Sequence, residues 1–264
     1  MDLLLAGKNA LITGSTAGIG FAIATELARE GVRVVLNGRS QSGVEAAIKR
    51  LRGMVPGAEV SGFAADLATA YGCHALTSSC PRVDILVNNL GIFDPVPFEE
   101  IGDGDWQRFF DTNVMSGVRL ARHYLPQMKA ADWGRIVFIS SESGVNPPGE
   151  MVHYGMTKAA ELSISRGLAQ TAAGTGVTVN AVLPGPTRTE GVTDFFAKLA
   201  TAQGIDLVEA ERRFFAEARP TSLLKRFIDP AEVAALVAYV CSPRAAATNG
   251  AALRVEGGII SSMC

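Results

Sequence analysis

The stretch NALITGSTAGIG, residues 9 to 20, decides the fold of this chain. It begins with a short apolar run that predicts a buried strand, and a helical stretch follows it directly. Between the two, Gly14, Gly18 and Gly20 permit a tight turn and a close approach of backbone to ligand. Backbone N–H groups and the positive end of the helix dipole then point at one place, which suits a phosphate. The G-x-x-x-G-x-G spacing differs from the general dinucleotide fingerprint, so a glycine-rich turn without a ligand stays the alternative.

The rest of the chain repeats this alternation of strand and helix. Strands are predicted over residues 9–13, 32–37, 59–65, 83–89, 135–140, 176–184 and 252–258. Helices are predicted near residues 18–30, 41–53, 68–80, 104–130, 151–173 and 230–241. Several strand runs are almost continuously apolar, which is typical of strands buried on both faces. We therefore expect an α/β fold: one Rossmann-type, doubly wound parallel sheet of about seven strands with helices on both faces. Without linkers or repeats, residues 1–264 are expected to form a single domain.

Residues 187–228 interrupt this rhythm, because they are too long for an ordinary connection. The segment is helical in parts and follows a strand whose carboxyl end faces the ligand side of such sheets, so we expect a substrate lid. The aromatic and aliphatic side chains of this segment, and its arginines, can each be interpreted in two ways. The aromatic and aliphatic set is expected to pack a helical hairpin rather than to line a hydrophobic pocket: Phe195, Phe196, Leu199, Phe214 and Phe215. The basic set is expected to be solvated rather than to bind an anionic substrate: Arg188, Arg212, Arg213 and Arg219.

The composition excludes several classes of protein. The chain has 264 residues, 48% hydrophobic and 19% charged, so it can bury a large core and is not disordered. Its net charge of −2 lacks any basic block, which argues against nucleic acid as a partner. No apolar run is long enough to cross a membrane, and the N-terminus lacks the basic start of a signal peptide. The cysteines show no metal-binding spacing and predict free thiols in a reducing, cytoplasmic setting without a metal site: Cys73, Cys80, Cys241 and Cys264.

The end of the second strand bears on the choice of cofactor. An acid there commonly holds the ribose 2′-hydroxyl of NAD, but this chain has Asn37 and Gly38. Arg39 follows and, with Ser40, could hold a 2′-phosphate. NADP(H) is therefore favoured over NAD(H), with a solvated Arg39 as the alternative.

The stretch VHYGMTKAA, residues 152 to 160, places a phenol and an amine four positions apart. An isolated tyrosine phenol has a pKa of about 10 and an isolated lysine amine a pKa of about 10.4, so neither group by itself is suited to proton transfer near pH 7. On a helix, Tyr154 and Lys158 lie on one face and can act together. A tyrosine at a core edge beside a lysine on the rim is the alternative. The adjacent His153 points away from this face and is not expected to take part.

Taken in order from about residue 7 to 258, the motifs resemble the short-chain dehydrogenase/reductase family. TGSTAGIG is similar to the family's glycine turn, NNLG to its N-N-A-G, and YGMTK to its Y-x-x-x-K. The remaining matches are Asp66 in FAADLA, Asn113 in FFDTNV, the block GRIVFISSESG, LPGPTRT, and VEGG with Glu256 in place of aspartate. Two features depart from the family: Leu90 is bulkier than the usual alanine, and the segment after Asp66 leaves little room for a third helix.

The resemblance implies a catalytic set of Asn113, Ser141, Tyr154 and Lys158. Tyr154 would be the proton donor or acceptor. The Lys158 ammonium, together with the positive charge of an oxidised nicotinamide, would lower the pKa of Tyr154, and Lys158 would also hold the nicotinamide ribose. Ser141, thirteen residues before Tyr154, would polarise the carbonyl, and Asn113 would hold a water for proton relay. Strand alternation puts Ser140 on the opposite side. Ser143 would add a hydrogen bond or cap the turn, and Glu142 is expected to be solvated rather than to bind substrate.

The resemblance also implies how the cofactor is held. Asp66 would contact adenine, while Thr187 and Thr189 would contact the nicotinamide carboxamide or else only stabilise their own turn. The full set of expected cofactor residues is Gly14, Ser15, Gly18, Ile19, Gly20, Arg39, Ser40, Asp66, Leu67, Asn88, Gly91, Tyr154, Lys158, Pro184, Gly185, Thr187 and Thr189.

The expected function is an NADP(H)-dependent oxidoreductase that interconverts a ketone and a secondary alcohol, with 3-oxoacyl thioesters among the candidate substrates. The alternatives are an NAD-dependent alcohol or polyol dehydrogenase of the same family, a catalytically silent nucleotide-binding scaffold, and a nucleotide-sugar enzyme. The resemblance implies a homotetramer or dimer formed through the helices near 104–130 and 151–173.

Overall fold

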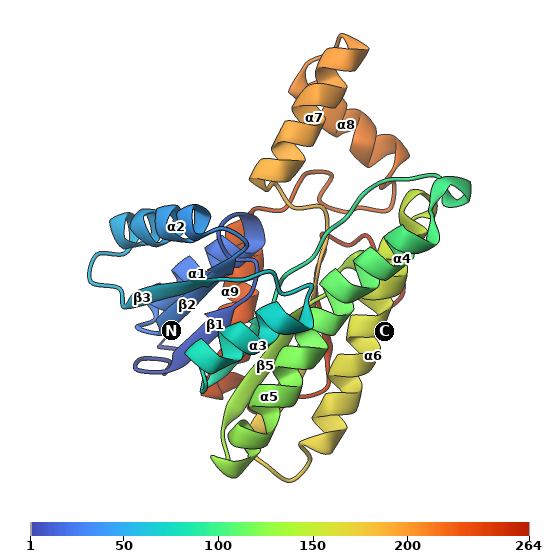
Figure 1. The fold of residues 1–264 in the computed structure, drawn as a ribbon. Coiled ribbons are helices and arrows are strands. Elements are labelled where there is room, and N and C mark those ends of the chain that lie inside the picture. Colours follow the sequence, from blue (N-terminus) through green and yellow to red (C-terminus); the bar gives the residue numbers. More distant parts are fainter. Residues whose placement is uncertain (1, 264) are drawn as a thin grey trace.

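The seven strands pair in parallel in one sheet, in the order β3-β2-β1-β4-β5-β6-β7 (Figure 1). In this computed structural model, which describes residues 2–263, the strand order reverses between β1 and β4. At such a switch point the carboxyl ends of the strands leave a crevice for a ligand. The bounds of the strands are β1 Asn9–Ile12, β2 Arg33–Gly38, β3 Val60–Ala64, β4 Ile85–Asn88, β5 Gly134–Ile139, β6 Val177–Pro184 and β7 Ala252–Val255. The predicted doubly wound sheet is confirmed.

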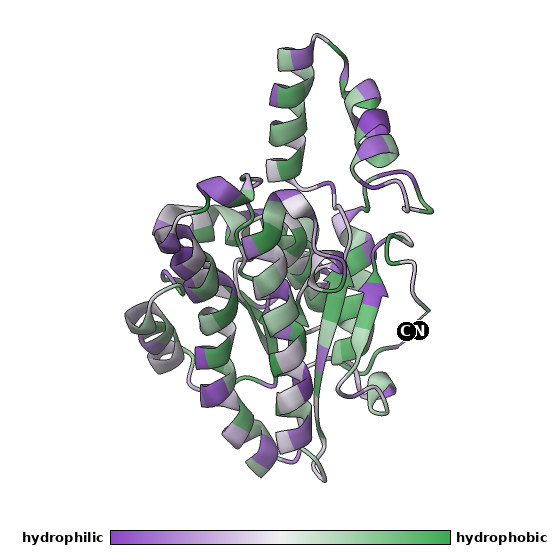
Figure 2. Cartoon of the chain, turned by 90° about the vertical axis from the view of Figure 1, so that its right-hand side faces the viewer, coloured by the Kyte–Doolittle hydropathy of each residue, from purple (hydrophilic) through white to green (hydrophobic). Residues whose placement is uncertain are grey.

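Helices cover both faces of the sheet (Figures 1 and 2). One face carries α1 (Gly18–Arg29), α2 (Gln41–Met54) and α9 (Pro230–Cys241). The other face carries α3 (Ala70–Ser79), α5 (Ser116–Ala130) and α6 (Val152–Thr171), and α4 (Asp103–Phe109) packs against α6. A π-helical stretch, Phe110–Met115, joins α4 to α5. Figure 2 shows apolar residues gathered in the strands and on the inner faces of the helices.

The third helix is present although the sequence left little room for it. Helix α3 begins after Thr69, whose hydroxyl accepts a hydrogen bond from the Gly72 N–H at 3.0 Å. A cap of this kind satisfies one of the free N–H groups in the first turn, which favours a short helix. Leu76 of α3 is fully buried in the core beneath. Helix α3 lies within the helix predicted near residues 68–80, so the segment after Asp66 does have room for a third helix.

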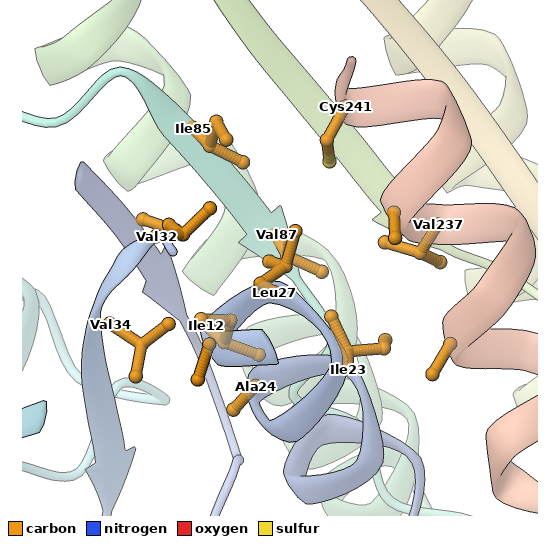
Figure 3. Packing of buried hydrophobic residues seen from close by; sticks show 14 of the residues in the cluster. Ile12, Ile23, Ala24, Leu27, Val32, Val34, Ile85, Val87, Val237 and Cys241 are labelled. Atoms are coloured by element: carbon orange, nitrogen blue, oxygen red, sulfur yellow. The ribbon is translucent and has the colours of Figure 1, made fainter. Parts of the chain in front are cut away.

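The core between β1, α1 and α9 fixes the position of the glycine turn. Ile12 ends β1, and Ile23 and Leu27 of α1 pack beside it together with Val87 of β4 and Val237 of α9 (Figure 3). All five side chains are fully buried. Each contributes about 1.5–3 kcal/mol when transferred from water to the core. This packing holds the N-terminus of α1 at the carboxyl end of the sheet.

The segment 187–228, called the lid segment below, forms a helical hairpin that projects from the body (Figure 1). Its helices are α7 (Glu190–Gln203) and α8 (Leu207–Glu217). They enclose a small core of their own, separate from the two cores beside the sheet: Phe196, Ala200, Ala210, Phe215 and Phe227. The prediction that the lid aromatics pack a helical hairpin is confirmed for Phe196 and Phe215.

Within residues 2–263, no helix is long and apolar enough to cross a membrane. In the same range, no group of three or more His, Cys, Asp or Glu side chains is placed to hold a metal ion. Cys73, Cys80 and Cys241 are free thiols, whereas Cys264 lies outside the described residues.

Candidate active site

The glycine turn holds its shape through left-handed glycines and internal hydrogen bonds. Gly14 and Gly18 have φ angles of +58° and +56°, a region that residues with a side chain rarely adopt. The Ser15 hydroxyl donates to the Ile12 carbonyl at 2.7 Å and accepts from the Asn37 N–H at 3.0 Å. Asn37 in turn accepts from the Gly14 N–H at 3.3 Å. The Ser15 side chain therefore supports the turn.

An anion already lies against this turn. The Glu190 carboxylate accepts a hydrogen bond from the Gly18 N–H at 2.9 Å, and Arg50 of α2 lies 3.4 Å from its other oxygen. Hydrogen bonds from its own N–H and from Gly18, together with Arg50, hold the pKa of Glu190 below its ordinary value. Its oxygens stand in for those of a phosphate at the N-terminus of α1. The turn thus fits the pyrophosphate of a dinucleotide, and Glu190 is a contact that sequence reasoning missed.

The expected adenosine end lies at the carboxyl ends of β2 and β3. Arg39 is exposed there, and the Ser40 hydroxyl caps α2 by accepting from the Gly43 N–H at 3.2 Å. Asp66 is also exposed, while Leu67 is buried. Because β2 ends in Asn37 and Gly38 instead of an acid, the exposed Arg39 guanidinium is compatible with a 2′-phosphate.

Four predicted catalytic residues come together from three parts of the chain. Tyr154 and Lys158 lie one turn apart on α6, and the Lys158 Nζ is 5.6 Å from the Tyr154 ring centre. Ser141 follows β5, and Asn113 lies in the π-helical stretch. A β-carbon added at Gly91 would lie 3.4 Å from Lys158 Nζ and 3.7 Å from Asn113 Oδ1, so Gly91 lies in van der Waals distance of both side chains. The prediction that Tyr154 and Lys158 lie on one face of a helix is confirmed.

Asn113 braces the site through its side chain. Its amide donates to the Ile92 carbonyl at 3.0 Å and to the Thr157 hydroxyl at 2.9 Å. Its Oδ1 accepts from the Ile92 N–H at 2.8 Å. The side chain thus ties the loop after β4 to α6 and is already engaged.

The hydroxyls of Ser140 and Ser141 have different partners, although Ser140, Ser141 and Ser143 all line one cavity. The Ser140 hydroxyl donates to the Lys158 carbonyl at 2.8 Å and so holds α6 to the sheet. The Ser141 hydroxyl donates to Glu142 and accepts from the Ser143 N–H at 3.1 Å. Ser141 and Tyr154 line the same cavity, which has a volume of about 410 Å³. Ser143 serves the turn through its backbone.

Glu142 is not solvated, which corrects the expectation from sequence. It is 5% exposed, and its second oxygen lies 3.4 Å from Nε of Arg219 in the lid segment. Arg219 is itself buried and also contacts Glu150 at 3.1 Å. Arg219 is therefore the exception among the lid arginines. The other three form exposed ion pairs with glutamates of α8: Arg188 with Glu211, and Arg212 and Arg213 with Glu209.

The pKa of Tyr154 is raised, although the sequence predicts that Lys158 lowers it. Burial raises the pKa most, Lys158 opposes this, and the carboxylates of Glu142 and Glu161 add to the rise. Burial alone would lower the pKa of Lys158, but Glu161 and Tyr154 outweigh it, so the pKa lies above the ordinary value. The attraction of Lys158 for the phenolate is thus present but does not dominate in the chain by itself.

The wall of the cavity opposite Tyr154 comes largely from the lid segment. Phe196, Phe214 and Phe227 pack on one another with ring centres 5.0–5.6 Å apart, and they also line the cavity. Phe195 and Leu199 line it as well, whereas Phe215 is buried in the lid core. The two interpretations of the lid aromatics therefore hold together, because the packing of the hairpin forms one wall of the pocket.

The remaining predicted cofactor residues lie at strand ends. The Thr187 hydroxyl donates to the Gly185 carbonyl at 2.8 Å, and Thr189 caps α7 by accepting from the Val192 N–H at 3.3 Å. Both therefore make the local bonds of turn residues. The buried side-chain amide of Asn88 has no hydrogen-bond partner within residues 2–263.

His153, as expected, stays apart from the catalytic set: it is 1% exposed and its ring lies 3.9 Å from that of Phe109.

Comparisons with known proteins find a family model and similar chains that cover most or all of the sequence. The family model described as short chain dehydrogenase matches residues 8–200. The uncharacterized oxidoreductase YvaG of Bacillus subtilis is 49% identical over 263 residues, with full coverage of both chains. The structure of L-sorbose reductase from Gluconobacter frateurii with NADPH and L-sorbose is 34% identical, covers all of both chains and has a TM-score of 0.93. Actinorhodin polyketide ketoreductase with NADPH is 32% identical, covers 96% and 97%, and has a TM-score of 0.85.

A doubly wound sheet, a glycine turn that holds an anion and a Tyr–Lys pair beside a cavity define a nucleotide-dependent oxidoreductase. The chain belongs to the short-chain dehydrogenase/reductase family.

Proposed function

We propose that the chain is an NADP(H)-dependent oxidoreductase that interconverts a ketone and a secondary alcohol. The observation that carries this proposal is that Tyr154 and Ser141 line one cavity, with Lys158 behind the tyrosine. Two hydroxyl groups can then reach the same carbonyl oxygen. We further propose that residues 1–264 act as a single domain in the cytoplasm.

In carbonyl reduction, the Ser141 hydroxyl turns its proton from Glu142 to the substrate oxygen and draws charge toward that oxygen. Tyr154 gives its proton to that oxygen as the carbon–oxygen double bond becomes single, and the phenolate takes up a proton for the next turnover. The nicotinamide, when bound, supplies the hydride that the carbonyl carbon accepts. Lys158, held as an ammonium ion, stabilises the phenolate. In alcohol oxidation each transfer runs in reverse.

The preference for NADP(H) is supported by charge at the end of β2. Arg39 is exposed there, and Asn37 stands where an acid would repel a phosphate. Two structurally similar enzymes, L-sorbose reductase and actinorhodin ketoreductase, were solved with NADPH. The residues proposed to hold the cofactor are those of the glycine turn and strand ends predicted above, with Ser15 acting through its backbone.

The substrate is proposed to be a small ketone or ketose, or a 3-oxoacyl thioester. The cavity offers an apolar wall of phenylalanines and a polar end formed by Ser141, Glu142 and Arg219. The names of two similar proteins support these substrate classes. One is an L-sorbose reductase, named for a ketose, and the other is a polyketide ketoreductase. We also propose a homotetramer or dimer formed through α4, α5 and α6, which light scattering after size exclusion tests.

The decisive experiment is NADPH consumption with a panel of simple ketones, ketoses and 3-oxoacyl thioesters. Tyr154→Phe should lower kcat by roughly 10²–10⁴-fold, because it removes the proton donor. Tyr239→Phe is the matched control, since Tyr239 lies on α9 and is 40% exposed. Unchanged turnover in Tyr154→Phe would contradict the mechanism. NADPH binding without turnover of any substrate would favour the silent scaffold.

A further inference from the structure

A buried acid lies directly behind the Tyr–Lys pair. Glu161, one turn after Lys158 on α6, is 2% exposed. Its two carboxylate oxygens lie 3.1 Å and 3.2 Å from Lys158 Nζ. The Lys158 ammonium also donates to the Ile139 carbonyl of β5 at 2.9 Å. Glu161 and Ile139 therefore take up much of the donor capacity of Lys158 and fix its direction.

Burying a carboxylate in this position lowers the stability of the fold unless an opposite charge compensates it. A buried carboxylate loses its hydration, and within residues 2–263 Lys158 is the charged group that contacts Glu161. A neutral residue could fill the same space without this cost. The pair as a whole carries no net charge, so the phenol one turn earlier faces an ion pair instead of a lone ammonium.

We propose that Glu161 is a positioning residue of the catalytic pair, whose carboxylate holds Lys158 in place as an ammonium ion and cancels part of its pull on Tyr154. This inference rests on the proposed function of Tyr154 as proton donor and acceptor. Glu161 thereby keeps the phenol protonated, which suits reduction of a carbonyl. The positive charge of an oxidised nicotinamide would act against this effect.

The charges around Tyr154 agree with this role. Lys158 favours the phenolate, while Glu161 on the same helix and Glu142 after β5 disfavour it. Glu142 is itself paired with Arg219 of the lid segment. Burial raises the pKa of Glu161 to about 7, although Lys158 pulls it down. Glu161 is thus largely ionised at any pH at which Tyr154 begins to lose its proton.

The test is Glu161→Gln, which keeps the size and shape of the side chain but removes its charge. The Tyr154–Lys158 pair should then release its first proton at lower pH, by on the order of one pH unit, because one negative charge nearby is gone. The acid limb of the pH profile of kcat/KM for alcohol oxidation should move down by the same amount. At a fixed pH on that limb, oxidation should become roughly tenfold faster.

A second readout does not depend on turnover. Tyrosinate absorbance of the cofactor-free chain, with that of the Tyr154→Phe variant subtracted, reports the ionisation of Tyr154 alone. It should also shift to lower pH in Glu161→Gln. Ser165→Ala is the matched control, because Ser165 is a buried polar residue one turn further along the same face of α6.

The outcomes separate the inference from the proposed function. If no substrate is turned over but the absorbance titration shifts, the role of Glu161 stands and the proposed function fails. If turnover is found but neither the pH profile nor the titration moves, Glu161 is only a packing residue and the inference is overturned. Equal shifts in Ser165→Ala would also overturn it, since that change removes no charge.

Discussion

The lid segment should unfold separately from the body when its core is weakened. Phe227 is 5% exposed and contacts the rings of Phe196, Phe214 and Phe215 at 5.0–5.6 Å. Replacing a buried phenylalanine with alanine costs about 3–5 kcal/mol. Because the lid core shares no buried residue with the two cores beside the sheet, this cost should fall on the lid segment.

The expected effect of Phe227→Ala follows from that figure. A tenfold change in an equilibrium constant corresponds to about 1.4 kcal/mol, so the equilibrium constant for closing the hairpin should fall roughly a hundred- to few-thousandfold. Hydrogen exchange followed by mass spectrometry measures this directly. The amides of α7 and α8 should lose protection by that factor, while those of β5 and β6 keep theirs.

Val208→Ala provides the control, since Val208 lies on α8 but is 78% exposed. It should leave protection nearly unchanged. Equal loss of protection in the hairpin and in the central strands would refute the reasoning, because the lid segment would then be part of the same cooperative unit as the sheet.

Two further predictions concern the cofactor. Arg39→Ala should weaken NADPH binding roughly ten- to hundredfold through loss of a charged hydrogen bond, with little change in NADH binding. Titration of cofactor fluorescence measures both affinities, with Arg29→Ala as the control. Equal losses of NADPH and NADH affinity would contradict the role of Arg39. Glu190→Ala should tighten NADPH binding severalfold, because the Glu190 carboxylate accepts a hydrogen bond from the Gly18 N–H at 2.9 Å. Asp194→Ala, which removes an acid from the same helix, is the control. Unchanged or weaker NADPH binding in Glu190→Ala would contradict this prediction.

The sequence by itself determined the frame of the molecule. Continuous apolar runs predicted the seven strands, and glycines after the first run predicted a tight turn into the first helix. The spacing of Tyr154 and Lys158 predicted a shared face. These inferences succeeded because helix and strand periodicity act within a few residues of chain.

Only the tertiary structure decided the charges around the site. Glu190 reaches Gly18 across 172 positions, and Arg219 reaches Glu142 across 77. No local pattern predicts such contacts, so Glu142 was expected to be solvated and is buried instead. Glu161 lies only three residues from Lys158, yet its importance depends on burial beneath β5 and β6. Burial of a charge is a property of the assembled fold, and in the cofactor-free chain burial raises the pKa of Tyr154 although Lys158 lowers it.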